Sequence, residues 1–230
     1  MIFYDRETIV NALEFNDNIK FEVINVDDVS IIQSTEIFKN YENFLELYSS
    51  FPVLPSSPNT NNPFMEQSFS NIIEDSFSII AEMCIKKTLP KMKILNRRDC
   101  RSNVGQYSKL KSPISSIFPH LDTDHNFQMV CNYWVNVSHG DGTQLWECDQ
   151  IKTDHDLLEY RNSHFDVNLV LNWFNIEESY DLKKKYFIKA KNNTCIFYFS
   201  NILHSPVINE DDKLRCSIVS WYDLVEDNDN

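Results

Sequence analysis

Alternating and helix-spaced apolar residues predict the first elements of this chain. Residues 21–27 alternate between apolar and polar side chains, which predicts a strand. Apolar residues then recur at helical spacing, and Ser34 or Thr35 is a suitable cap for a helix that runs to about Ser50. The chain is therefore predicted to begin with a strand followed by a helix.

The rest of the chain changes from loop to helix and then to strands. Residues 52–63 contain four prolines and predict a loop, and an amphipathic pattern predicts a second helix from about Pro63 to Lys87. Stretches rich in aromatic and β-branched residues then predict strands at 91–96, 103–109, 127–137, 143–148, 166–173, 185–190, 194–199 and 214–222. Helices first and strands afterwards predict an α+β fold with a β-sandwich or barrel in its C-terminal part.

Length and composition favour one globular domain over residues 1–230. The chain has 42% hydrophobic and 13% aromatic residues, enough to build a sizeable core. We expect residues 1–90 to form the first strand and supporting helices, 91–223 the β-rich core, and 224–230 a flexible acidic tail.

Charge and glycine content exclude several classes of function. The formal net charge is -13, and the densest cationic run, Lys183–Lys185, has acidic neighbours, so we expect no nucleic-acid partner. The chain has only three glycines, too few for a glycine-rich phosphate-binding loop. Phosphate-loop nucleotide chemistry is therefore not expected.

Hydropathy and cysteine spacing predict a cytoplasmic protein. No apolar run approaches the roughly 18 residues that cross a bilayer, so we expect no membrane association. The six cysteines include no Cys-x-x-Cys pair, which favours buried thiols in a reducing compartment over a zinc knuckle.

A histidine and a carboxylate two residues apart form the first candidate for chemistry. His120 and Asp122 would point to the same side of an extended segment, where both can chelate one metal ion. Asp124, which keeps the same parity, and His125 are competing candidate ligands, although rim or turn positions are the favoured interpretation of both. A site of this kind needs another ligand from elsewhere in the fold.

The C-terminal strands offer that ligand and a nearby cation. His204 follows the apolar strand at 194–199, and two histidines with one carboxylate leave open positions on an iron(II) ion. Arg215 and Ser217 share one face of the strand at 214–222. A buried guanidinium beside a hydroxyl is suited to binding a carboxylate.

The order of these motifs resembles the Fe(II)/2-oxoglutarate-dependent dioxygenases, especially their prolyl-hydroxylase-like branch. The resemblance covers roughly residues 90–223. Its motifs are Pro119-His120-Leu121-Asp122, Asn132-Tyr133-Trp134-Val135-Asn136, Gly140-Asp141-Gly142-Thr143, His204-Ser205-Pro206 and Arg215-Cys216-Ser217.

The resemblance implies a double-stranded β-helix, that is, a jelly-roll, cupin-like core with N-terminal supporting helices. It implies Fe(II) held by His120, Asp122 and His204, with 2-oxoglutarate as co-substrate and O2 as oxidant. The distal carboxylate of 2-oxoglutarate would bind Arg215 and Ser217, and turnover would release succinate and CO2. Hydroxylation is the expected outcome, because Asp122 is present where related halogenases have a small residue.

The sequence departs from the family pattern at two positions. Many relatives have two adjacent glycines before the threonine, whereas Asp141 here separates two glycines. Trp134 stands where some relatives have a tyrosine that contacts 2-oxoglutarate, and an indole cannot accept a hydrogen bond. We therefore expect Tyr107 or Asn132 to make that contact.

Two other classes of function compete with an oxygenase. A catalytically idle, cupin-like binding module has no chemical need for the metal ligands together with Arg215. A zinc hydrolase can use two histidines and an aspartate, but no evident general base accompanies them. For an oxygenase we expect a small-molecule, amino-acid or peptide substrate; its identity and the oligomeric state are not readable from the sequence.

Overall fold

A computed structural model describes residues 5–55, 65–67, 71–105, 119–122, 128–153, 155–156, 159, 182–208 and 213–227. Its helices are α1 (Arg6–Ala12), α2 (Tyr41–Ser49) and α3 (Asn71–Thr88). Its strands are β1 (Phe21–Val26), β2 (Val29–Thr35), β3 (Val53–Pro55), β4 (Met65–Gln67), β5 (Met92–Gly105), β6 (Gln128–Asn136), β7 (Gly142–Glu147), β8 (Lys183–Lys189), β9 (Thr194–Phe199), β10 (His204–Val207) and β11 (Arg215–Glu226).

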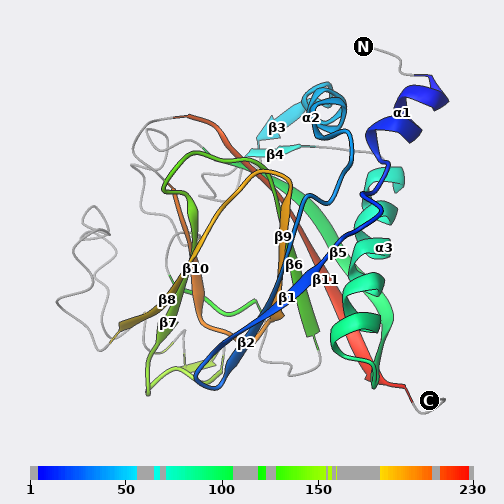
Figure 1. Cartoon of the computed structure of the whole chain (residues 1–230). Coiled ribbons are helices and arrows are strands. Elements are labelled where there is room, and N and C mark those ends of the chain that lie inside the picture. The colour runs from blue at the N-terminus through cyan, green and yellow to red at the C-terminus, as the bar shows by residue number, and fades with distance from the viewer. Residues whose placement is uncertain are drawn as a thin grey trace.

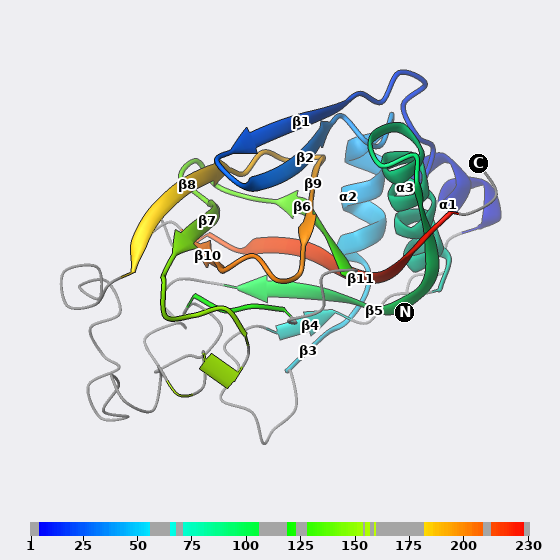
Figure 2. The ribbon, with the colours of Figure 1, turned by 90° about the horizontal axis from the view of Figure 1, so that it is seen from below.

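The strands form two antiparallel sheets that face each other. The larger sheet has the order β1-β2-β9-β6-β11-β5-β4-β3, and the smaller has the order β10-β7-β8. The helices cover the outer face of the larger sheet, while the smaller sheet lies on its other side (Figure 1 and Figure 2). This is a jelly-roll, double-stranded β-helix core with supporting helices, so the predicted fold class is confirmed.

Apolar side chains fill the space between the helices and the larger sheet. Phe77 of α3 is fully buried against Tyr133 of β6, with 5.2 Å between their ring centres. Phe38 and Phe44 stack at 4.3 Å in the same cluster. Burying each large side chain contributes about 1.5–3 kcal/mol, so this layer anchors the outer face of the sheet.

A smaller apolar cluster lies between the two sheets. Leu145 and Ile188 of the smaller sheet pack with Val130, Trp134 and Ile196 of the larger one. This cluster fills only part of the interior. The remainder is lined by polar side chains and forms the site described below.

The predicted helix after the first strand begins later than expected. Residues 29–35 form β2 instead, which pairs with β1 and with β9, so the assignment of Ser34 or Thr35 as a helix cap was wrong. Glu36 has a φ of 57°, which ends the strand, and Asn40 precedes α2. Pairing on both edges outweighed the helical spacing of the apolar residues.

The other corrections concern element ends and short elements. Val53–Pro55 form β3 inside the segment predicted as a loop, and neither α1 nor β10 was predicted. The strand predicted at 166–173 lies outside the described residues.

Residues 65–67 form β4, so the second helix begins at Asn71 and not near Pro63. The strand predicted at 91–96 and the first part of the strand predicted at 103–109 belong to one strand, β5, whose pairing with β11 shifts register instead of ending. Bulges of this kind bend a strand while the chain continues. Residues 106–109 lie outside the described residues.

The C-terminal acidic segment is partly ordered. β11 continues to Glu226, the Asp227 N–H donates to the Lys91 carbonyl, and Lys93 pairs with the Asp227 carboxylate at 2.9 Å. The prediction of a flexible tail from 224 was therefore wrong for 224–227, and 228–230 lie outside the described residues.

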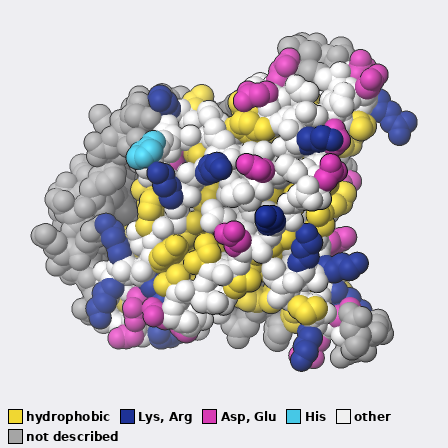
Figure 3. Space-filling model, viewed as in Figure 1, with side chains coloured by type: hydrophobic (Ala, Val, Ile, Leu, Met, Phe, Trp, Pro, Cys, Tyr) yellow, Lys and Arg dark blue, Asp and Glu magenta, His cyan; other side chains and the backbone are white. Residues whose placement is uncertain are grey.

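On the face drawn in Figure 3, lysines and arginines are interspersed with aspartates and glutamates, so the charge on that face is mixed. None of the helices in the described part of the chain has the length and apolar character needed to span a bilayer.

Candidate metal and co-substrate site

Two histidines that are distant in sequence meet through their backbones. The His120 N–H donates to the His204 carbonyl at 2.8 Å, and the His204 N–H donates to the His120 carbonyl at 3.0 Å. Their imidazole centres lie 4.4 Å apart. Because the pair is held by the main chain, the directions of both side chains follow from backbone geometry.

Asp122 brings a carboxylate to the same place. Its N–H donates to the Ser200 carbonyl at 3.0 Å, which holds the chain after His120, and its Oδ2 lies 3.5 Å from His204 Nε2. Ligand atoms of His120, Asp122 and His204 all lie within 4.8 Å of one another. The structure therefore gathers the three predicted ligands into one group that one ion can contact.

Hydrogen bonding around His204 prepares one ring nitrogen for a metal. The Nδ1 of His204 lies 2.8 Å from the Ile202 carbonyl, which can only accept, so Nδ1 carries the proton. The Nε2 then carries a lone pair that can bind a cation, a common arrangement of metal-binding histidines.

Tyr198 lies beside this nitrogen. Its hydroxyl is 3.1 Å from His204 Nε2, and the side chain is buried. Burial, together with the charge of nearby Asp122, raises the pKa of Tyr198 well above its ordinary value. The hydroxyl therefore stays protonated and is a neutral donor beside the ligand group.

Arg215 supplies a buried positive charge to the same cavity. It is 3% exposed at the start of β11, and its Nη1 donates to Ser217 Oγ at 3.4 Å. Burial lowers the pKa of the Arg215 guanidinium, whereas the negative charge of Asp141 acts in the opposite direction. A guanidinium remains cationic at neutral pH even so, so the cavity contains a charge suited to an anionic ligand.

The turn between β6 and β7 places Asp141 in the interior. The Asp141 Oδ2 accepts the Ser138 N–H at 2.7 Å, and Gly140 has a φ of 105°, which favours glycine. A Cβ on Gly142 would lie 2.4 Å from the Ile188 carbonyl oxygen, so a glycine is required there too. The inserted aspartate is thus accommodated with its carboxylate buried.

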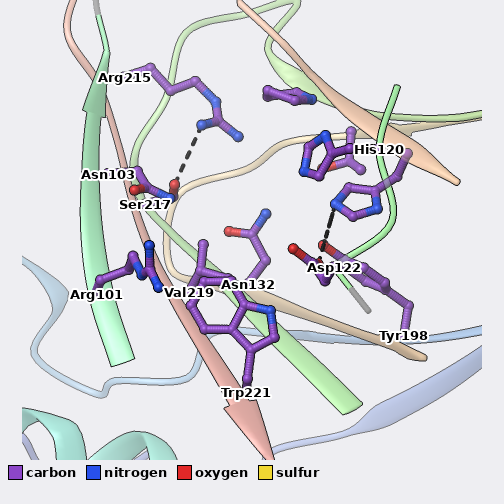
Figure 4. A pocket seen from close by; sticks show the side chains of 13 residues that line it. Arg101, Asn103, His120, Asp122, Asn132, Tyr198, Arg215, Ser217, Val219 and Trp221 are labelled. Atoms are coloured by element: carbon purple, nitrogen blue, oxygen red, sulfur yellow. Dashed lines mark hydrogen bonds and ion pairs between the residues drawn. The ribbon is translucent and has the colours of Figure 1, made fainter. Parts of the chain in front are cut away.

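A cavity of about 210 Å³ joins the metal-ligand group to Arg215 (Figure 4). Asn132 lines it, and the Asn132 Oδ1 has no hydrogen-bond partner among the described residues. Trp134 is fully buried in the apolar cluster between the sheets. The structure therefore brings Asn132 to the site, whereas Tyr107 lies outside the described residues, as do Asp124 and His125.

Sequence reasoning missed several residues of the cavity wall. They belong to five segments of the chain and are Arg101, Asn103, Thr143, Tyr198, Pro206, Val219 and Trp221. Part of this wall follows from strand register, because Arg101 lies opposite Val219 and Asn103 opposite Ser217. The alternation within each strand was readable, but nothing in the sequence shows which strands are neighbours.

Unpartnered polar atoms show that the residues fit a metal and an anionic co-substrate. Asp122 Oδ2, Asn132 Oδ1 and Arg215 Nε are buried without a hydrogen bond to any described residue. Leaving such atoms unpaired costs about 1–3 kcal/mol each, and a cation at Asp122 with a carboxylate at Arg215 would satisfy two of them. Two imidazoles and one carboxylate are also a ligand set that suits iron(II).

Solved structures show what the fold is similar to. The epimerase SnoN, in a complex with Fe3+, alpha ketoglutarate and nogalamycin RO, aligns with a TM-score of 0.52 and 11% identity, over 85% of this chain and 80% of that one. The chain has the fold of this epimerase.

Further structures align less well. HygX from Streptomyces hygroscopicus, with nickel, 2-oxoglutarate and hygromycin B bound, aligns at 9% identity and a TM-score of 0.48 over 96% of this chain and 87% of that one. No family model and no curated protein matches the sequence.

Proposed function

We propose that this protein is a non-haem Fe(II)- and 2-oxoglutarate-dependent oxygenase that hydroxylates an organic substrate. The observation that carries the proposal is the meeting, in one cavity, of the His120, Asp122 and His204 ligand group with the buried Arg215. The motif order Pro119–Asp122, Gly140–Thr143 and Arg215–Ser217 supports the prolyl-hydroxylase-like branch. The shared fold with SnoN is compatible with this chemistry.

Each residue of the site has a defined task in this proposal. His120, Asp122 and His204 hold the metal, and the Nδ1 hydrogen bond of His204 keeps its Nε2 directed at it. Arg215 and Ser217 bind the distal carboxylate of 2-oxoglutarate. Bound iron supplies the oxidation of a substrate C–H bond by O2, coupled to conversion of 2-oxoglutarate to succinate and CO2.

The protein's own groups orient the reactants and protect the site. The buried guanidinium of Arg215 fixes one end of the co-substrate, so that its keto acid end is directed at the metal ligands across the cavity (Figure 4). Tyr198 remains protonated, so it is a neutral hydroxyl group beside the ligand group. Asp122 occupies a ligand position, so we propose hydroxylation and not halogenation as the outcome.

The competing classes are less compatible with this cavity. A zinc hydrolase uses the three ligands but gives Arg215 no purpose, and a buried guanidinium is costly to keep without one. An idle binding module likewise has no need for the three ligand residues together with a buried Arg215 in one cavity. The oxygenase explains both halves of the cavity.

The experiment that tests the proposal is an anaerobic titration of the purified protein with Fe(II) and then 2-oxoglutarate. Formation of the complex is expected to give a weak visible metal-to-ligand charge-transfer band, and addition of O2 is expected to release succinate. His204→Ala should lose the band, because the metal loses a ligand. The matched control is His155→Ala, whose imidazole is 75% exposed, and it should keep the band.

Metal bound without a band, together with no release of succinate, would contradict the oxygenase. Zinc-supported hydrolysis of model esters or amides would then favour the hydrolase. Binding of small molecules without turnover would favour the idle module.

A further inference from the structure

One wall of the cavity has no task in the proposed chemistry. Arg101 and Asn103 project from β5, and Trp221 from β11, into the space across from the metal ligands (Figure 4). They lie on the inner face because Arg101 pairs with Val219 and Asn103 with Ser217 in the sheet. This wall therefore faces the same space as the co-substrate site without belonging to it.

Trp221 and Asp99 orient the Arg101 guanidinium, and Asp99 occupies one of its edges. The guanidinium lies over the Trp221 ring, with its Cζ 4.9 Å from the ring centre. Its Nε donates to Asp99 Oδ2 at 2.9 Å, and its Nη2 donates to the same oxygen. Asp99 therefore occupies the edge formed by Nε and Nη2. On the other edge, formed by Nη1 and Nη2, the guanidinium has no hydrogen bond to a described residue other than Asp99.

The pair with Asp99 does not block that edge. Both side chains are about half exposed, at 47% for Arg101 and 44% for Asp99, and an ion pair at such exposure contributes little to stability. The other oxygen of Asp99 accepts the Cys100 N–H at 2.8 Å and is not turned to Arg101. Asp99 thus orients the guanidinium and leaves two N–H groups for a ligand carboxylate, the geometry of a bidentate pair.

Arg101 and Arg215 differ in exposure, so they are suited to different ligands. Arg215 is 3% exposed and hydrogen-bonded to Ser217 inside the barrel, as a resident co-substrate requires. Arg101 also lines the cavity, but its side chain is 47% exposed and therefore reaches solvent. A β-bulge between Trp221 and Tyr222 lies beside it, and bulges are common where a sheet directs side chains toward a site.

Asn132, which lies between Arg101 and the metal ligands, requires a hydrogen-bond donor on the substrate. It is 7% exposed, and its Oδ1 is an acceptor without a partner among the described residues. An amino or hydroxyl group on the ligand would satisfy it. A carboxylate alone would not, because it has no proton to donate.

We propose that Arg101 binds the carboxylate of the substrate. The substrate is then a small carboxylic acid with an amino or hydroxyl group for Asn132, in place of the contact between Asn132 and 2-oxoglutarate that the sequence predicted. This assignment rests on the proposed oxygenase function, which it deepens. The cavity of about 210 Å³ lies below the usual range for ligand pockets and must also hold 2-oxoglutarate, so a small substrate fits it.

The test measures succinate release in the presence of the proteinogenic L-amino acids and a set of short hydroxy acids, each beside its primary amide. At least one free acid is expected to stimulate release, and its amide, which lacks the negative charge, is not. In Arg101→Gln the acid concentration for half-maximal stimulation should rise about tenfold or more. The matched control is Arg98→Gln, which removes an exposed arginine of β5 that pairs with Asp223 instead of lining the cavity; it should behave as the parent protein does.

The charge-transfer band separates failure of this inference from failure of the proposed function. Arg101→Gln should keep the band and the parent affinity for 2-oxoglutarate, so a lost band in this variant would overturn the separation of the two arginines. If the parent protein forms the band but no acid in the panel stimulates release, or an amide stimulates as well as its acid, the carboxylate subsite is overturned. A parent protein that binds metal without giving the band and releases no succinate contradicts the oxygenase proposal itself.

Discussion

The two faces of β11 have opposite character although their residues alternate along one strand. Cys216, Ile218 and Tyr222 face the helices and belong to the apolar core. Arg215 and Ser217 face the cavity, where polar atoms are buried without partners. Packing on the helix-side face stabilises the fold, whereas the cavity face keeps polar groups unpaired for ligands. Substitutions on the helix side should therefore change the free energy of unfolding, and substitutions on the cavity side should change ligand affinity.

The largest expected effect comes from the helix-side core. Phe77→Ala should lower the free energy of unfolding by about 3–5 kcal/mol, because it leaves a hole against Tyr133 in a layer with no solvent access. Urea denaturation measures the loss, and the folded fraction should still form the charge-transfer band. Ile79→Ala on the same helix is the control, because Ile79 is 47% exposed and its loss should cost about 0.5 kcal/mol. Equal losses in the two variants would show that α3 does not pack as described.

Substitutions on the cavity face should lower the affinity for 2-oxoglutarate. Arg215→Ala should raise the 2-oxoglutarate concentration for half-maximal band formation about 100-fold, because a buried charge-assisted pair is lost. Fe(II) binding should persist, since the ligand group is unchanged. Arg215→Lys should fall between, because an ammonium keeps the charge without the fork. An unchanged 2-oxoglutarate dependence in Arg215→Ala would remove Arg215 from the co-substrate site.

The most gradual expected effect is a pH dependence of stability that comes from two buried thiols on the helix side. Burial raises the pKa of Cys84 to about 12 and that of Cys216 to about 11, from an ordinary value of 9.0. Both thiols stay protonated in the folded state after the unfolded chain has ionised. Their contribution to stability is therefore complete below about pH 9, and it is lost as the pH rises toward 11 and 12.

Urea denaturation between pH 8 and pH 11 measures this decline, at up to about 1.4 kcal/mol per pH unit for each thiol. Cys84→Ala should show a shallower decline than the parent protein. An identical slope in the variant would mean that the Cys84 thiol ionises as readily in the folded protein as in the unfolded chain.

The candidate site was readable where its chemistry depends on local spacing. His120 and Asp122 stand two residues apart, as do Arg215 and Ser217, and alternation along an extended chain places each pair on one side. The apolar run before His204 likewise marked the end of a strand. Such features need no knowledge of which strands are neighbours.

The remainder depends on contacts between distant segments. Residues 29–35 became a strand because β9 pairs with them, a partner that the local pattern does not reveal. Arg101 entered the cavity wall because β5 lies beside β11 in a particular register. A shift of one residue in that register would turn Arg101 to the opposite face, so its role was visible only in the folded chain.

The backbone bridge between His120 and His204 implies that folding precedes metal binding. Among the three ligands, only His120 and Asp122 are close together in the unfolded chain. Closing the long loop to His204 has an entropic cost, which β-sheet pairing offsets during folding. A metal ion therefore finds its full ligand group only after the barrel has closed. Iron then binds the native state far better than the unfolded one, so cellular iron supply becomes a determinant of how long each folded copy survives.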